Sequence, residues 1–232
     1  MSMTKSLNAE SRLDIFLPCY NCAGTLRRTL NSIQRQTFKN FRVVMIDNNS
    51  KDGSVDIFKN FHDDRFEYVL HAKTVPLGDN FNRCLERVES DYYCIMHADD
   101  EYQQDYVEVM ITAMNEHPGA LLAYCNASII DENSKIKFSL KNIIKKGMSA
   151  SREAIHTGCA GLVWISEYNK IIAPTVMYRR SAIDAVGKFN PELKFTVDWE
   201  YYFRALKSGG EILFVNKVLL NYRIHANQQT AT

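Results

Sequence analysis

The sequence predicts an α/β fold, with a mainly parallel sheet that helices cover on both faces. Short apolar runs alternate with helical patterns in units of about 25 residues through the first half of the chain. One run, Phe41–Ile46, is almost continuously apolar, as strands buried on both faces are. Polar clusters follow several runs, which is typical of sheets that bind ligands beyond the carboxyl ends of their strands.

Five strands are expected in the first half, because each is a short apolar run bounded by polar or turn residues. They are Leu13–Leu17, Phe41–Ile46, Phe66–Leu70, Tyr92–Met96 and Ala120–Ile130. Four helices are expected between them, since apolar residues recur there at spacings of three and four. They are Thr25–Gln36, Ser54–Phe61, Asn80–Val88 and Tyr106–Asn115. Pro118 and Gly119 end the last helix, and Asp131–Asn133 favours a hairpin turn.

After about residue 131 the alternation changes. The lysine-rich segment Lys135–Lys146 is interpreted as a flap or edge hairpin, either plainly solvated or a basic lid over phosphates or anionic lipid. A strand, two helices that glycines close, and two final strands follow. They are Pro174–Tyr178, Ser181–Val186, Thr196–Lys207, Ile212–Val215 and Val218–Tyr222. No linker divides the chain, so one domain is expected over residues 1–232.

The bulk composition is that of an ordinary globular protein. The 232 residues are 46% hydrophobic and 24% charged, with a net charge of +1, so the charge favours neither nucleic acid nor a membrane as partner. No apolar run approaches the roughly 18 residues of a spanning helix. The polar N-terminal residues lack a signal-peptide core, which predicts a cytoplasmic location by default. Peripheral contact with the inner face of the plasma membrane stays open.

Six cysteines are present, and two of them have a spacing that needs an interpretation. Cys19 and Cys22 are separated as in redox or zinc sites. A zinc site would need a second close pair, which the sequence lacks, and the residues around the pair do not follow a thioredoxin-like pattern. Neither role is therefore expected. Cys94 and Cys125 lie in apolar runs and are interpreted as buried.

Two adjacent carboxylates, Asp99 and Asp100, come directly after an apolar strand. Like charges repel there, and desolvating them is costly unless a cation or hydrogen bonds compensate. Carboxylates suit Mg²⁺ or Mn²⁺, which commonly bridge phosphates. Polar clusters at Cys19–Asn21 and Asp47–Asn49 end two other strands, so all three clusters are expected at one edge of the sheet. The pattern predicts a metal–phosphate site.

Six stretches match the pattern of a known family in its own order: Leu17–Asn21, Val43–Ser54, His97–Asp100, Val186–Phe189, Val197–Glu200 and Tyr222–His225. On these residues the chain resembles family 2 glycosyltransferases, inverting enzymes of bacterial cell-surface polysaccharide synthesis. The resemblance implies the GT-A fold, a Rossmann-like sheet between helices. It also implies a nucleotide-sugar-binding half over about 10–130 and a smaller, mixed-sheet, acceptor-binding half over about 131–232.

The same resemblance implies a reaction. A sugar would move, with inversion, from a nucleoside-diphosphate sugar, most often a UDP-sugar in this family, to a carbohydrate or lipid-linked saccharide. Asp198 would be the base that takes the acceptor proton. Asp99 and His225 would hold Mn²⁺ or Mg²⁺, which neutralises the departing diphosphate, and Arg223 would contact phosphate.

The resemblance further implies a set of donor-site residues. They are Pro18, Tyr20, Asn21, Asp47, Asn49, Asn80, Arg83, His97, Ala98 and Asp99. Asp47 would accept the imide N–H of uracil or thymine. His97 stands where relatives often have an aspartate, which removes one negative charge. Three residues would act beside the reacting groups. They are Asp100 as support, Trp199 as a pocket wall and Glu200 as a structural pairing residue.

Simpler roles stay open for several of these residues. Asp47 would suit a turn, Asp100 or Asp198 a helix N-cap, and Tyr20 or His225 an exposed surface. The alternative functions are a catalytically inactive sugar-nucleotide-binding protein, which the substitution at His97 keeps open, and a nucleotidyltransferase. The latter is disfavoured because the segment after the first strand lacks a basic, glycine-rich loop. A homodimer is neither favoured nor excluded.

Overall fold

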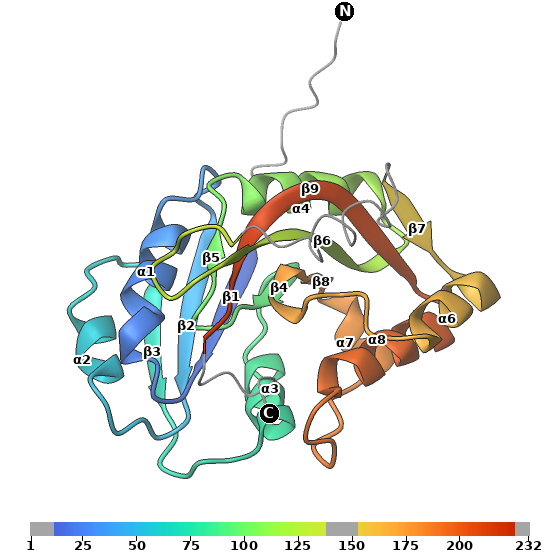
Figure 1. The fold of residues 1–232 in the computed structure, drawn as a ribbon. Helices are drawn as coiled ribbons and strands as arrows, with labels where there is room; N and C mark the ends of the chain where they lie inside the picture. The colour runs from blue at the N-terminus through green and yellow to red at the C-terminus, as the bar shows by residue number, and fades with distance from the viewer. Residues whose placement is uncertain (1–11, 138–152, 226–232) are drawn as a thin grey trace, which may run out of the picture.

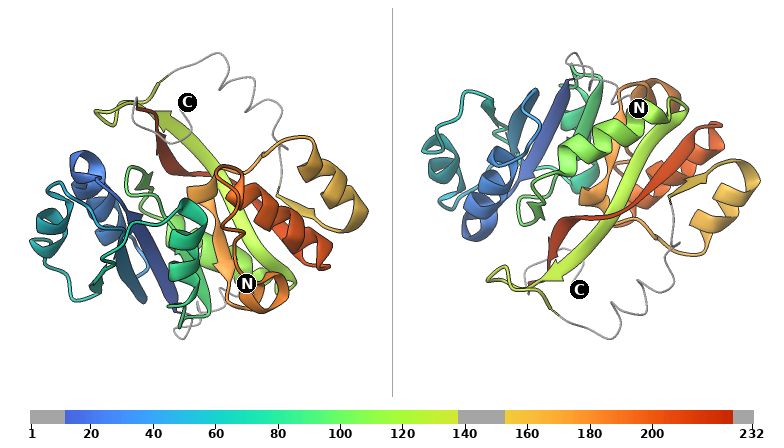
Figure 2. Two further views of the ribbon diagram at one scale, coloured as in Figure 1. Left: turned by 90° about the horizontal axis from the view of Figure 1, so that it is seen from below. Right: turned by 90° about the horizontal axis from the view of Figure 1, so that it is seen from above.

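The computed structural model describes residues 12–137 and 153–225. It contains a mixed, mainly parallel sheet in the order β3-β2-β1-β4-β8-β6-β9-β5, with β7 paired to β9. Helices lie on both faces of this sheet (Figures 1 and 2). The predicted α/β class is confirmed.

The strands follow the prediction closely in the first half. They are β1 (Leu13–Cys19), β2 (Phe41–Asp47), β3 (Phe66–Leu70), β4 (Tyr92–Ile95), β5 (Glu101–Tyr102), β6 (Ala120–Ile130), β7 (Ala154–His156), β8 (Met177–Arg179) and β9 (Glu211–Arg223). The helices are α1 (Ala23–Gln34), α2 (Ser54–Lys59), α3 (Leu77–Leu85), α4 (Tyr106–Glu116), α6 (Gly158–Ser166), the 3₁₀ turn η1 (Ala173–Thr175), α7 (Ser181–Val186) and α8 (Val197–Lys207).

The core consists of two hydrophobic layers, one on each face of the sheet. Successive residues of a strand point to opposite faces, so neighbours on β2 belong to different layers. Val43 and Met45 belong to the layer that includes α1 residues such as Leu30. Val44 and Ile46 belong to the other layer, which includes the buried residues of α3 and α8. Burial on both faces explains why the strand sequences are nearly continuous apolar runs.

Strand direction brings distant parts of the chain to one edge. β1 to β4 are parallel, and β8 is antiparallel to both β4 and β6. β6 and β9 are parallel to each other, so they run in the same direction as β1 to β4. The carboxyl ends of all six strands therefore lie along the same edge of the sheet. The antiparallel β8 begins at this same edge.

The secondary structure differs from the prediction at four elements. The last two predicted strands form one strand, β9, because a shift in its pairing with β6 near Cys125 and Asn126 accommodates the exposed residues Asn216 and Lys217 without a break. Helix α6 and the short strands β5 and β7 were missed. The apolar residues of α6 do not recur on one face, since Val163 is 65% exposed while Ile165 is buried.

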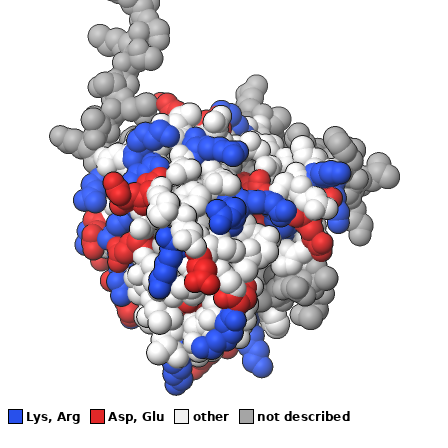
Figure 3. All heavy atoms as spheres, turned by 90° about the vertical axis from the view of Figure 1, so that its left-hand side faces the viewer, with Lys and Arg blue, Asp and Glu red and all other residues white. Residues whose placement is uncertain are grey.

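The expected hairpin turn is present after β6. Asp131 N–H donates to Lys135 O at 2.9 Å, and Lys137 N–H donates to Ile129 O at 2.9 Å. Most of the predicted lysine-rich flap, Lys135–Lys146, lies outside the described residues. Within residues 12–137 and 153–225, no helix combines the length and apolar character that a bilayer crossing requires. On the face beside α1, α2 and β3, acidic and basic side chains are interspersed (Figure 3).

A buried carboxylate on β1 ties the sheet to the turn before β4. Asp14 is fully buried, and its oxygens accept hydrogen bonds from Ser90 Oγ at 2.8 Å, from Glu89 N–H at 2.8 Å and from Ser90 N–H at 3.0 Å. Arg42 on β2 donates to the same carboxylate at 3.1 Å. A buried charge is tolerated when its hydrogen-bonding capacity is filled in this way.

We expect Asp14→Ala to lower the free energy of unfolding by about 2–4 kcal/mol, because the buried N–H groups of Glu89 and Ser90 lose their acceptor. Urea unfolding followed by circular dichroism measures this. The control is Glu67→Ala, which removes a half-exposed partner of Arg42 and should change stability by less than about 0.5 kcal/mol. Equal effects of the two substitutions would contradict this role of Asp14.

Candidate functional site

The loop after β4 gathers three side chains that could bind a metal ion. His97, Asp99 and Asp100 each offer a ligand atom, and these atoms lie within 4.8 Å of one another. A fourth group comes from the end of the described chain, where His225 Nε2 lies 3.0 Å from Asp99 Oδ2. His225 and Asp99 are 126 residues apart in sequence, and the parallel arrangement of β4 and β9 brings them together.

Asp100 is the most buried member of the cluster. Its side chain is fully buried, and its Oδ1 accepts the Arg223 N–H at 2.8 Å. Among the described residues, Asp100 Oδ2 has no hydrogen-bond donor, and His97 Nδ1 lies 3.9 Å away. Burial, and after it the charge of Asp99, raises the pKa of Asp100 well above its ordinary value. An uncompensated buried oxygen beside a second carboxylate fits a hard divalent cation.

Arg223 at the end of β9 fixes the backbone of this loop. It is fully buried, and its guanidinium donates to the backbone oxygens of Asp99 and Asp131 at 2.7 Å each and to the carboxylate of Glu101. The expectation that Arg223 contacts phosphate was wrong, because this side chain is committed to protein oxygens inside the fold. Sequence pattern alone could not reveal this, since these contacts depend on how β9 lies beside the loop.

Two threonines of α1 hold the other side of the loop. Thr25 Oγ1 donates to Ala98 O at 2.9 Å, and Thr29 Oγ1 donates to Asp100 O at 2.8 Å. Asp100 does not supply a side-chain cap to α4, whose N-cap is Asp105. The N-cap alternative for Asp100 was therefore wrong.

Asp47 lies at the carboxyl end of β2, beside the end of β1. It is fully buried, with Oδ1 accepting Ser50 N–H at 2.9 Å and Oδ2 accepting the Tyr68 hydroxyl at 2.8 Å. Burial and this hydrogen bond raise the pKa of Tyr68 to about 12. The contact to Ser50 is the turn role that the sequence left open, and each oxygen keeps a second lone pair. Tyr68 was missed because it lies within a strand, whereas the sequence analysis looked for site residues only where strands end.

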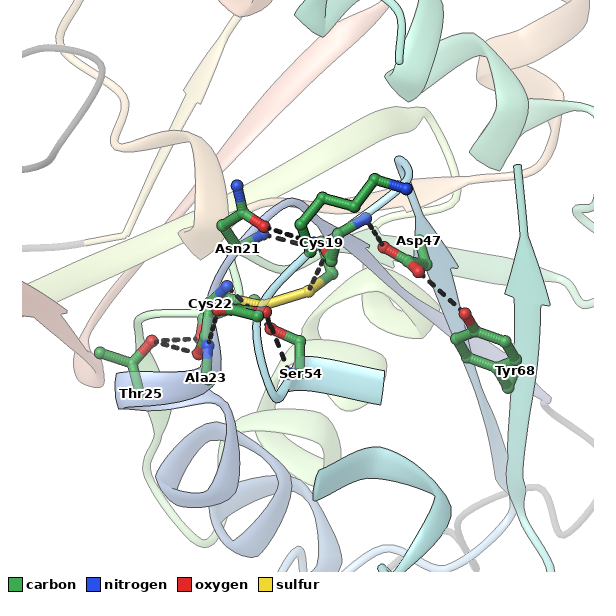
Figure 4. The surroundings of a disulfide bond; sticks show 12 residues. Cys19, Asn21, Cys22, Ala23, Thr25, Asp47, Ser54 and Tyr68 are labelled. Atoms are coloured by element: carbon green, nitrogen blue, oxygen red, sulfur yellow. Dashed lines mark hydrogen bonds between the residues drawn. A yellow bond between two sulfur atoms is a disulfide. The ribbon is translucent and has the colours of Figure 1, made fainter. Parts of the chain in front are cut away.

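The turn after β1 holds an unexpected covalent link, a disulfide between Cys19 and Cys22 (Figure 4). The interpretation that this pair has no redox chemistry is thereby reopened. Tyr20 in the turn is 54% exposed. Asn21 has a left-handed backbone, with φ of 54°, which asparagine tolerates better than most residues. Pro18 is partly buried at the end of β1, and Asn49 has φ of 69° on the facing loop.

Helix α3 carries the predicted residues Asn80 and Arg83. Arg83 donates to Asn48 Oδ1 at 3.0 Å and to Lys73 O at 3.1 Å. Asn80 is buried, and its Oδ1 has no donor among the described residues. Arg83 also lines a groove of about 580 Å³ between α3 and residues 188–191, which the acidic cluster does not line.

Asn82, also on α3, was missed by the sequence analysis. Its side chain exchanges two hydrogen bonds with the backbone of Phe189, at 2.9 and 2.8 Å. Lys188 pairs with Glu86 of the same helix at 2.6 Å. These contacts attach the segment before α8 to α3, on the lower side of Figure 1. An asparagine at helical spacing gives no sequence signal for such a tie.

Asp198 lies in the first turn of α8. The N-cap of this helix is Thr196, with φ of 50°, so the N-cap alternative for Asp198 was wrong. Asn169 Nδ2 donates to Asp198 Oδ2 at 3.0 Å. Trp199 Nε1 donates to Ile165 O at 2.7 Å, and Glu200 pairs with Arg204 at 2.5 Å. Asp198 is thus oriented by Asn169, whereas the polar groups of Trp199 and Glu200 are engaged with Ile165 and Arg204.

Comparison with known proteins identifies the family. Residues 14–186 match the model described as Glycosyl transferase family 2, which is well over half of the chain. The chain belongs to this family. The match includes β1, β2 and the acidic loop of this glycosyltransferase family 2 member, but it ends before Asp198 and His225.

Curated relatives agree with this membership. An uncharacterized glycosyltransferase of Rickettsia prowazekii is 25% identical over 222 residues, which cover 95% of this chain and 66% of the relative. The amylovoran biosynthesis glycosyltransferase AmsB of Erwinia amylovora is 23% identical over 219 residues, covering 90% of this chain and 69% of AmsB. The chain thus spans about two thirds of the length of these relatives.

A solved structure shows the same fold. S. aureus TarS 1-349 in complex with UDP-GlcNAc superposes with a TM-score of 0.77 and 17% sequence identity, covering 95% of this chain and 61% of TarS. At this identity the similarity establishes the fold, and the expected GT-A architecture of this family 2 member is confirmed.

We expect Arg223→Met, which keeps the side-chain volume, to lower the free energy of unfolding by about 3–5 kcal/mol. The substitution leaves the buried oxygens around Arg223 without their cation. Chemical denaturation measures the loss. Lys217→Met, which removes a half-exposed ion pair with Asp105, is the control and should cost less than about 1 kcal/mol. A loss below 1 kcal/mol for Arg223→Met would show that the acidic loop holds its shape without it.

Proposed function

We propose that this chain transfers a sugar from a nucleoside-diphosphate sugar, specifically a UDP-sugar, to a saccharide or lipid-linked saccharide, with inversion. One observation carries the proposal. The acidic loop, with the orphaned oxygen of Asp100 and with His225 against Asp99, lies at the sheet edge where β1 and β2 also end. That TarS, with the same fold, was solved with UDP-GlcNAc supports the choice of donor.

In this proposal Asp99 and His225 hold Mn²⁺ or Mg²⁺, and Asp100 Oδ2 supports them. Oxygen and imidazole ligands suit both ions. When bound, the ion would neutralise the diphosphate oxygens and so assist departure of the nucleoside diphosphate. His97 lines the same site, where it can hydrogen-bond a ribose hydroxyl. Arg223 and the α1 threonines keep the loop backbone in place, so that little reorganisation is needed when the ion and donor bind.

Donor recognition would fall to residues of about 10–130. The base would lie against Pro18 and Tyr20, with Asn21 and Asn49 on the turns beside it. Asp47 would accept the imide N–H of the base through the lone pairs that Ser50 and Tyr68 leave. Asn80 and Arg83 on α3 and Ala98 in the acidic loop would complete the donor side.

Asp198 would be the base, acting on the acceptor bound by residues of about 131–232. Asn169 orients its Oδ2, which leaves Oδ1 to take the proton of the acceptor hydroxyl. The acceptor oxygen then forms a bond to the anomeric carbon, and the carbon–oxygen bond to the diphosphate breaks on the opposite side. Both bonding electrons leave with the diphosphate, and the anomeric centre inverts. Trp199, fixed by Ile165, would wall the pocket beside it.

We expect Asp198→Asn to lower the turnover number by about 10²- to 10⁴-fold while the Kd for UDP stays within about twofold of wild type. The amide keeps the shape of the side chain but cannot take a proton. The measurements are UDP release from a panel of UDP-sugars with saccharide acceptors and Mn²⁺, and calorimetric titration with UDP. Asp184→Asn, on the exposed surface of α7, is the control and should match wild type.

Two outcomes would contradict the proposal. A lost affinity for UDP in Asp198→Asn would remove Asp198 from the role of base. UDP binding without turnover in wild type, across the whole panel, would favour the alternative of an inactive sugar-nucleotide-binding protein.

A further inference from the structure

The turn after β1 is closed by a covalent bond within four residues. The Cys19–Cys22 disulfide encloses Tyr20 and Asn21, which the proposed function assigns to the donor base (Figure 4). Cys19 is the last residue of β1, and Cys22 is the residue that precedes α1. The disulfide therefore joins the strand to the helix across the two residues that the proposed function places beside the base.

We propose that Cys19 and Cys22 form a reversible thiol–disulfide site, and that the disulfide form holds the turn in the shape that binds the donor nucleotide. The thiol–disulfide pair is inferred from the structure alone, whereas its effect on donor binding rests on the proposed function.

The backbone on both sides of the turn is anchored independently of the disulfide. Cys19 O accepts Asn48 N–H at 2.8 Å, so the end of β1 remains paired with β2. Cys22 N–H donates to Ser54 Oγ at 2.9 Å, and Ala23 N–H donates to Asp52 at 2.9 Å, so the start of α1 is held by the facing loop. Reduction should therefore loosen the turn without unfolding the sheet.

The residues between the two cysteines depend more on the covalent constraint. Asn21 keeps its left-handed backbone with two contacts to the facing loop, Asn21 N–H to Ser50 Oγ at 3.0 Å and Lys51 N–H to Asn21 Oδ1 at 2.8 Å. Tyr20 is more than half exposed. Fixing the backbone of such residues costs conformational entropy, which a closed ring removes before the ligand arrives. When the disulfide is reduced, the entropy cost of ordering these residues lowers the affinity for the nucleotide instead.

The same turn is linked through Ser50 to Asp47, the aspartate proposed to read the base. Ser50 accepts the Asn21 N–H through its Oγ, while its own N–H donates to Asp47 Oδ1 at 2.9 Å. Cys19 Sγ lies 3.9 Å from Ser50 Oγ and is opposite Asp47 in the β1–β2 pairing. Ser50 is thus the single residue that lies between the disulfide and the Asp47 carboxylate, which would bind the imide.

The two cysteines differ in solvent exposure, and this difference determines which sulfur a reductant attacks first. Cys19 is 1% exposed, whereas Cys22 is partly exposed. A dithiol reductant would attack Cys22 with one thiolate, breaking the disulfide and releasing Cys19 as a thiolate that takes up a proton. The second thiol of the reductant then displaces Cys22 and becomes part of the oxidised reductant. Two electrons and two protons pass from the dithiol to the protein.

Charges near Cys22 act in opposite directions on this exchange. The amino end of the twelve-residue helix α1 stabilises a thiolate on Cys22, as helix N-termini do. The Asp52 carboxylate that accepts the Ala23 N–H offsets part of this effect. The other described cysteines are free, with Cys84, Cys94 and Cys125 buried and Cys159 exposed, so Cys159 provides an internal control.

The test compares oxidised and reduced forms of the full chain. The protein is reduced with dithiothreitol and then desalted, because free dithiols bind Mn²⁺, and air is excluded so that the thiols stay reduced. The oxidised sample is prepared in air without reductant and desalted alike, since oxidised glutathione would also react with the exposed Cys159. Mass spectrometry after maleimide labelling of denatured protein counts thiols. We expect four labels in the oxidised form and six in the reduced form, with recovery of four on reoxidation. Calorimetry with UDP and Mn²⁺ should then give a Kd about five- to tenfold weaker in the reduced form.

Variants separate the disulfide from other effects of reduction. Cys22→Ser, at the partly exposed position, should bind UDP as weakly as reduced wild type and should not respond to dithiothreitol. Cys159→Ser should behave as wild type in both forms. Reduction and Cys22→Ser should leave the turnover number at saturating donor within about twofold, because Asp198 and the acidic loop are unaffected.

Three outcomes would overturn the inference. Six labels in the oxidised sample would show that the disulfide does not form. Equal Kd values for UDP in the two forms would leave a disulfide without effect on the donor. Absence of binding of UDP, dTDP and GDP in both forms would refute the proposed function and the regulation with it, while the label count would still decide whether the thiol–disulfide site exists.

Discussion

A buried arginine at the end of β9 holds the acidic loop in place. Arg223 is surrounded by backbone oxygens of Asp99 and Asp131 and by the carboxylate of Glu101, and its N–H donates to Asp100. Each partner alone would be costly to bury: the cation because it loses hydration, and the acids because they repel one another. Together they compensate one another except at Asp100 Oδ2, which keeps no donor among the described residues, and a loop with three adjacent acids can pack against the protein interior.

The position of this arginine follows from the direction of the strands. Because β9 runs in the same direction as β4, its end meets the loop after β4, and His225, two residues beyond Arg223, comes to lie against Asp99. A second tie, between Asn82 and Phe189, fixes the segment that leads to Asp198 against α3. The sheet therefore brings together site residues that are far apart in the sequence. Contacts that do not touch the reacting groups, such as those of Arg223 and Asn82, hold these residues in position.

Much of the fold could be predicted because buried parallel strands are nearly continuous apolar runs, and polar clusters mark their ends. Asp99 and Asp100 were found in this way. Contacts between segments far apart in the sequence have no corresponding sequence pattern. The unbroken β9, the burial of Arg223 and the partners of Asp47 depend on which strands are neighbours, which periodicity does not encode. Helix α6 was missed because its apolar residues are spread around the helix. The Cys19–Cys22 link depended on geometry that spacing alone did not establish.

The most direct measurement is an anomalous difference map, recorded at the manganese absorption edge, from crystals soaked with Mn²⁺ and UDP. We expect one strong peak within bonding distance of Asp99 and His225, with diphosphate oxygens of UDP completing its coordination and the base beside Tyr20 and Asp47. A manganese peak elsewhere, or UDP bound at this edge with no peak beside Asp99, would contradict the assembly of the site around the acidic loop.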